Sequence, residues 1–122
     1  MTATIVGRIE ASIISLLGLG IVPLPIFYGD SNREHIETNH PDTYAKYAMG
    51  LASVISSIIK TPDYAGNRNG AIEYVKIMPD GEILKIAVRA SKKGVYFART
   101  MYRIQQGELD RFLAKGTLVK TP

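Results

Sequence analysis

The segments AIEYVKIM (71–78), ILKIAVRA (83–90) and VYFARTMYRI (95–104) follow one another with only short turns between them. Apolar and polar side chains alternate within each segment, and this period of two is typical of a β-strand. The connecting sequences, Pro79-Asp80-Gly81 and Ser91-Lys92-Lys93-Gly94, are rich in residues that favour turns. This stretch therefore predicts a three-stranded antiparallel meander.

On both sides of the meander, apolar residues recur at helical spacing. The expected helices lie at residues 4–17, from Ser31 onward, at 41–60 and at 106–115. Ser31 and Glu34 have the spacing of a capping box. Asn39 is the expected cap of the 41–60 helix, and Pro41 occupies its first turn, where a missing N–H costs nothing. We therefore predict an α+β fold, with helices packed on one face of a small antiparallel sheet of three to four strands.

Length and composition narrow the class of protein. A chain of 122 residues corresponds to one domain, or two at most. The absence of cysteine excludes a disulfide scaffold and thiolate metal sites. The uncharged segment 11–28 approaches the length of a membrane span, but Pro23 and Pro25 interrupt it. We expect no membrane span and a cytoplasmic protein.

Charge is distributed unevenly along the chain, whose formal net charge is +4. Residues 66–122 contain eleven basic and five acidic side chains, whereas residues 1–65 contain four basic and six acidic ones. A basic half of a small domain suits an anionic partner such as nucleic acid. The alternative is an ordinary solvated surface of Lys and Arg.

The alternation in the three strands also predicts how their faces differ. The expected helix-facing side chains are Val75, Ile77, Leu84, Ile86 and Val88, and the expected open face holds Lys76, Lys85, Arg89, Arg99, Arg103, Tyr74 and Phe97. Cations that share one face repel one another unless an anion is present, and interleaved aromatic rings can stack on bases. With Lys92 and Lys93 in the adjacent turn, this face is predicted to bind nucleic acid. Alternatively, the long basic side chains only solvate it.

The chain has two histidines, His35 and His40, and histidine is the side chain best suited to exchange protons near neutral pH. His40 precedes Pro41, which favours an extended backbone and should direct His40 into a cleft. The positive end of the following helix should lower its pKa. We therefore expect His40 to matter more than His35. A metal site formed with Glu37 is disfavoured, because the three residues do not line one helical face.

Three strings in order, REHIETNHPDTYAKY (33–47), SIIKTPDYA (57–65) and the meander, resemble the phage and mobile-element branch of the barnase/EndoU/colicin/RelE-like (BECR) nuclease superfamily. The resemblance covers about residues 33–119. It divides the chain into residues 1–30, an N-terminal helix with a Gly/Pro-rich apolar extension, and residues 31–122, a BECR-like nuclease domain.

The resemblance implies a toxin-like ribonuclease that needs neither metal nor cofactor. A ribose 2′-OH would attack the neighbouring phosphate, which requires a base, an acid and cations around the phosphate. The implied catalytic residues are His35 and His40 at the His-bearing helix, Lys85 and Arg89 in the middle strand, and Thr100 and Tyr102 in the last strand. The implied partners are RNA, with tRNA as one candidate, and an immunity or antitoxin protein.

The sequence leaves two points open. Strict alternation places Thr100 opposite Arg99 and Arg103, so either a bulge near Ala98 redirects it or the expected open face is partly wrong. The function also has alternatives. The chain could be a non-catalytic module that binds nucleic acid or protein, or a structural phage-like protein that assembles through residues 11–28.

Overall fold

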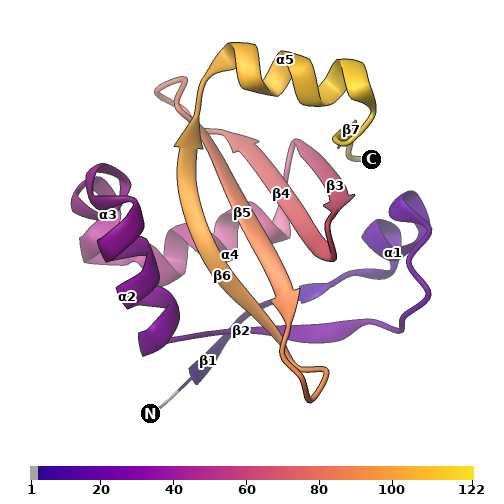
Figure 1. Cartoon of the computed structure of the whole chain (residues 1–122), viewed down its shortest axis with the longest axis horizontal. Helices are drawn as coiled ribbons and strands as arrows, with labels where there is room; N and C mark the ends of the chain where they lie inside the picture. The colour runs from indigo at the N-terminus through magenta and orange to yellow at the C-terminus, as the bar shows by residue number, and fades with distance from the viewer. Residues whose placement is uncertain (1–2) are drawn as a thin grey trace.

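A seven-stranded mixed sheet with five α-helices forms the structure, a computed structural model that describes residues 3–122 (Figure 1). The first two residues of the 1–30 segment lie outside the described residues. The strands are β1 (Ala3–Ile9), β2 (Leu24–Gly29), β3 (Tyr64–Arg68), β4 (Ala71–Ile77), β5 (Ile83–Ala90), β6 (Tyr96–Ile104) and β7 (Val119–Lys120). The helices are α1 (Ala11–Leu17), α2 (Asp30–Asn39), α3 (Pro41–Tyr47), α4 (Leu51–Lys60) and α5 (Gln106–Lys115).

The predicted meander is confirmed, because β4, β5 and β6 pair antiparallel in sequence order. The predicted sheet of three to four strands is too small, since the observed order is β1-β2-β6-β5-β4-β3-β7. β3 is not among the predicted strands, and it pairs with β4 through a turn at Asn69 and Gly70, both with positive φ. Asn-Gly is the strongest two-residue hairpin signal, so this strand could have been predicted.

The expected helix at residues 4–17 is wrong for its first half, which forms β1 before α1 begins at Ala11. The β-branched residues Ile5, Val6 and Ile9 fit either period, and pairing with β2 decides between them. β2 comes from the Gly/Pro-rich segment and runs parallel to β6, which makes the sheet mixed. Residues of the 3–29 segment, including Val6, Ile9 and Ile26, belong to the same hydrophobic core as the meander.

The helix at residues 41–60 is interrupted between α3 and α4 by a short 3-10 turn at Ala48–Gly50. Glycine is a poor helix former, which explains the break at Gly50. His40 takes the N-cap position of α3 rather than Asn39, whose side-chain amide donates to the His35 carbonyl oxygen. Pro41 occupies the first turn as expected.

The start of α2 also differs from its prediction. Gly29 is the N-cap, and its N–H donates to Asn32 Oδ1 at 3.0 Å, in place of the expected box of Ser31 and Glu34. The closing helix α5 has the expected bounds and ends at Gly116, which adopts the left-handed conformation.

Two hydrophobic clusters lie on opposite faces of the sheet. The main core packs Ile72, Leu84, Ile86, Val88 and Met101 against α2 and α4, and α4 passes behind the sheet in Figure 1. The second cluster packs Val75, Ile83 and Ile104 against Leu109 of α5 and Leu118. The prediction that helices cover only one face is therefore wrong, because α5 folds back over part of the other face.

Within residues 3–122 no helix combines the length and apolar character needed to cross a membrane.

Candidate functional site

The face of the sheet opposite the main core is called the outer face here. Its polar and aromatic side chains include Arg68, Glu73, Lys85, Arg89, Phe97, Thr100 and Tyr102. They share this face because the register pairs Lys85 with Tyr102, Arg89 with Phe97, and Glu73 with Ala87, which itself pairs with Thr100. Their neighbours along the strands, such as Ile86 and Val88, are buried in the main core.

The expected open face is wrong for Tyr74, Lys76 and Arg103, which lie on the face of the main core. Tyr74 pairs with Ile86 and is fully buried, so it cannot stack on a base. Lys76 Nζ donates to the Thr61 carbonyl oxygen at 2.6 Å, and Arg103 lies 3.7 Å from Glu82. For Tyr74 and Lys76 the error arises from register, because a slip of one residue moves a whole strand's side chains to the other face. For Arg103 it arises from an irregularity within β6, which reverses the alternation after Ala98.

A β-bulge in β6 places Thr100 on the outer face. Pairing shifts between Ala87–Thr100 and Val88–Ala98, so Arg99 is the extra residue. The bulge reverses the alternation between Ala98 and Thr100. Both sequence alternatives are thus true, since the bulge exists and the expected open face was partly wrong. Arg99 itself is exposed.

His40 lies at the junction of α2 and α3, beside the outer face. Its ring stacks on Tyr102 with a centroid distance of 4.5 Å and an interplanar angle of 14°. The edge of His35, which is exposed, approaches His40 with a centroid distance of 6.3 Å. His40 and Tyr102 line a hollow of about 210 Å³ together with residues such as Thr43. The tertiary structure therefore brings both histidines and the implied aromatic residue together.

Partial burial lowers the pKa of His40 below its usual value of 6.5, and the positive charge of nearby His35 lowers it further. The direction agrees with the sequence prediction, whereas the main cause is burial rather than the helix dipole. A lowered pKa keeps the imidazole neutral near neutral pH, so that it can accept a proton.

A buried ion pair lies next to Tyr102 on the outer face. Lys85 and Glu73 are only 1% and 3% exposed, and Lys85 Nζ lies 2.7 Å from Glu73 Oε2. Arg68 approaches the same carboxylate oxygen at 3.6 Å. The rings of Phe112 and Tyr102 cover Lys85 Nζ, with centroids 4.7 and 5.6 Å away. Lys85 is thus sealed from solvent in this arrangement and does not reach a substrate phosphate.

Three buried polar atoms in this region have no hydrogen-bond partner among the described residues: Glu73 Oε1, Lys85 Nζ and Thr100 Oγ1. Lys85 Nζ is nonetheless held by its ion pair with Glu73 Oε2. Sequence reasoning missed Glu73 and Arg68. The signal for Glu73 was a single carboxylate in a mostly apolar strand, which is costly to bury unless it is paired.

Exposed cations lie at the end of the outer face that is nearest to the turn between β5 and β6. Arg89 is exposed and donates to the Asn69 carbonyl oxygen at 2.7 Å. Lys92 and Lys93 are exposed in the turn between β5 and β6. Arg89 is therefore the cation of the predicted catalytic set that remains accessible on this face.

Side chains typical of a metal site do not converge in the part of the chain that the structure describes, where no group of three or more His, Asp or Glu could hold a metal ion. His35, Glu37 and His40 are accordingly not brought together as ligands. Glu37 instead pairs with Arg33 at 3.2 Å.

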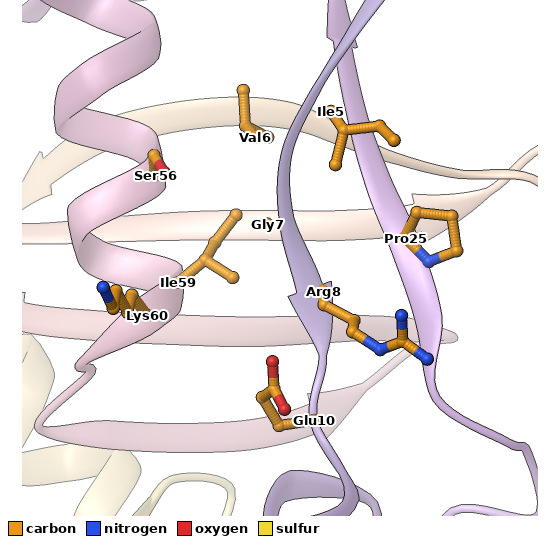
Figure 2. A pocket seen from close by; sticks show the side chains of 9 residues that line it. All are labelled: Ile5, Val6, Gly7, Arg8, Glu10, Pro25, Ser56, Ile59 and Lys60. Carbon is orange, nitrogen blue, oxygen red and sulfur yellow. The ribbon is translucent and has the colours of Figure 1, made fainter.

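A separate apolar cavity of about 520 Å³ lies between β1, β2 and α4, and Figure 2 shows its lining side chains. Ile59 closes one side against Gly7, where a Cβ would lie only 2.7 Å from Ile59 Cγ2. Arg8, Glu10 and Lys60 supply the charged groups of its lining. Neither histidine lines this cavity, so the hollow at His40 is the better candidate for chemistry.

Comparison with known proteins identifies the family to which the chain belongs. No curated protein and no solved structure matches the chain significantly. A family model described as phage-Barnase-EndoU-ColicinE5/D-RelE like nuclease3 matches residues 4–111. The match begins within β1 and so includes most of the 1–30 segment, which the sequence resemblance left outside. Because it covers well over half of the 122 residues, the chain belongs to the phage-Barnase-EndoU-ColicinE5/D-RelE like nuclease3 family.

Proposed function

We propose that the protein cleaves RNA without a metal ion, at the hollow where His40 stacks on Tyr102. The stacked, partly buried imidazole next to a cationic sheet face is the observation that carries this proposal. Membership of a nuclease family supports a nucleic-acid substrate. The 2′-OH of RNA supplies an internal nucleophile, so the reaction needs only proton transfer and charge stabilisation.

In the proposed reaction, neutral His40 accepts the proton of the ribose 2′-OH. The 2′ oxygen then forms a bond to phosphorus while the bond from phosphorus to the 5′ oxygen breaks. Protonated His35 returns a proton to the leaving 5′ oxygen. The products are a 2′,3′-cyclic phosphate and a 5′-hydroxyl end. Arg89, the accessible cation of the outer face, lies opposite Phe97, four residues along β5 from the partner of Tyr102, and binds a different phosphate of the same RNA strand.

The remaining residues of the predicted catalytic set have supporting roles in this proposal. Tyr102 holds the His40 ring in place by stacking. Lys85 and Glu73 hold Tyr102 from beneath, because Lys85 Nζ contacts that ring and is neutralised by the carboxylate. Thr100 places a buried hydroxyl beside them, and this hydroxyl has no hydrogen-bond partner within residues 3–122.

The biological setting is proposed from the resemblance to this superfamily. In this setting the protein acts in the cytoplasm as a toxin-like nuclease. Its target is tRNA, and its partner is an immunity or antitoxin protein.

The proposal is tested by incubating the purified protein with total RNA in EDTA. Cleavage that leaves 2′,3′-cyclic phosphate ends supports it, and cleavage only after a divalent cation is added contradicts it. The second candidate function is binding without cleavage, which the sealing of Lys85 beneath Phe112 favours. RNA that is bound but stays intact in every condition would favour that candidate.

A further inference from the structure

Two phenylalanine rings lie side by side at the end of the outer face that is far from His40. Phe27 in β2 pairs in parallel register with Phe97 in β6, and their ring centroids are 6.1 Å apart with an interplanar angle of 46°. Their neighbours Ile26 and Ala98 point into the main core, which directs both phenylalanines to the outer face. Both rings remain partly exposed. The main core is therefore complete without them.

The surroundings of this aromatic pair are cationic. Arg89 lies directly opposite Phe97 on the neighbouring strand and is held at its far end by the Asn69 carbonyl oxygen. Arg99, at the bulge, and Lys92 and Lys93, in the β5–β6 turn, are exposed near the same end of these strands. A stacking surface bordered by cations matches the two chemical parts of a nucleotide, its base and its phosphate.

The distance from the aromatic pair to His40 suits one continuous strand of RNA. Phe97 and Tyr102 lie five positions apart on β6, with one of those positions taken up by the bulge. At about 3.3 Å per residue, the separation is roughly 13–17 Å along the strand. A few nucleotides of extended RNA span this distance.

We propose that Phe27 and Phe97 form a base-stacking subsite for single-stranded RNA, with Arg89 as its phosphate contact. This inference rests on the proposed function, because it places the subsite a few nucleotides from the cleavage site. The substrate class follows from stacking, since the base faces of a duplex are already covered by neighbouring base pairs. The N-terminal strands thereby contribute directly to substrate binding, through Phe27.

Binding is measured with a short 2′-O-methyl oligoribonucleotide, which lacks the nucleophile and cannot be cleaved. Phe27→Leu and Phe97→Leu keep apolar volume but remove the aromatic face, and each is expected to weaken single-strand binding about tenfold. Phe97→Tyr, which keeps an aromatic face, should bind like the wild type. Val22→Ala changes an exposed apolar residue away from the sheet face and serves as the matched control.

A direct spectroscopic reading is available because the chain contains no tryptophan. In Phe97→Trp, a stacked base should quench the single indole when the oligoribonucleotide is single-stranded, and the same sequence as a duplex should not. Thermal melting confirms that each variant is folded. If a leucine variant fails to fold, the quenching experiment decides the question alone.

Wild-type affinity in both folded leucine variants, absence of quenching, or equal binding of the duplex would overturn the subsite. These outcomes are separate from the fate of the proposed function, since none of them requires cleavage. Quenching by a single strand in a protein that never cleaves RNA would support the subsite and contradict the nuclease proposal. RNA cleavage that is unaffected by both leucine substitutions, together with no quenching, would support the nuclease proposal and contradict the subsite.

Discussion

Two groups of ionisable residues touch Tyr102 from different sides, and they differ in their access to solvent. His40 stacks on the ring beside an open hollow and keeps a partly exposed imidazole. Lys85 lies against the same ring but is sealed with Glu73 beneath Phe112. Burial thus divides ionisable groups that look alike in the sequence: His40 stays open to solvent beside the hollow, and Lys85 is enclosed in the fold.

The largest expected effect comes from removing the accessible group. His40→Ala should reduce RNA cleavage by about 10²–10⁴-fold, the usual contribution of general acid–base catalysis, while RNA affinity changes only a few-fold. His35→Ala is the matched comparison and should lose less, because His35 does not stack on Tyr102. Cleavage rates and binding constants are measured side by side. If His40→Ala cleaved RNA at the wild-type rate, the accessible His40 would have no larger role in cleavage than the buried Lys85.

Breaking the sealed pair should affect stability. Glu73→Leu leaves Lys85 buried without a counter-charge and should reduce the free energy of unfolding by about 3–5 kcal/mol. Lys85→Met should lose less stability than Glu73→Leu, because Arg68 still lies 3.6 Å from the Glu73 carboxylate. The double variant Lys85→Met, Glu73→Leu should recover much of this loss, since apolar residues of similar size often replace a buried ion pair. Denaturant unfolding measures all three, and additive losses in the double variant would argue against a coupled pair.

The salt dependence of RNA binding should separate accessible from sealed cations. Arg89→Gln should lower the log–log slope by about 0.7, as expected when one phosphate contact to a single strand is lost. The double variant Lys85→Met, Glu73→Leu should leave the slope close to that of the wild type, because Lys85 makes no contact with solvent. A slope that falls equally in both proteins would show that α5 opens to expose Lys85 when RNA binds.

The smallest expected effect is the dependence of stability on pH. Burial lowers the pKa of His40 in the folded state relative to its unfolded value of 6.5, so the unfolded state binds a proton first as pH falls. The wild type should therefore lose a small amount of stability from about pH 6.5 downward, and the loss should level off below the lowered pKa. His40→Asn should lack this component. Unfolding curves of both proteins across this range provide the measurement, and parallel pH profiles would contradict the burial of His40.

Several parts of this fold could be predicted from the sequence because their causes are local. The alternation and turn residues of 71–104 specify the meander, and Gly116 ends α5 where expected. β1 was missed because its short apolar segment fits a helix and a strand equally well. β3 was missed although the Asn69-Gly70 signal was present.

For the candidate site, the sequence by itself determined the residue types. It supplied His40 before Pro41, a single carboxylate, Glu73, in a mostly apolar strand, and a basic second half. Only the tertiary structure decided which of them meet. The register of β4 on β5 and the bulge at Arg99 assigned each side chain to a face, and α5 sealed Lys85. These outcomes depend on contacts between segments far apart in the chain, and local periodicity contains no information about how strands are aligned or covered.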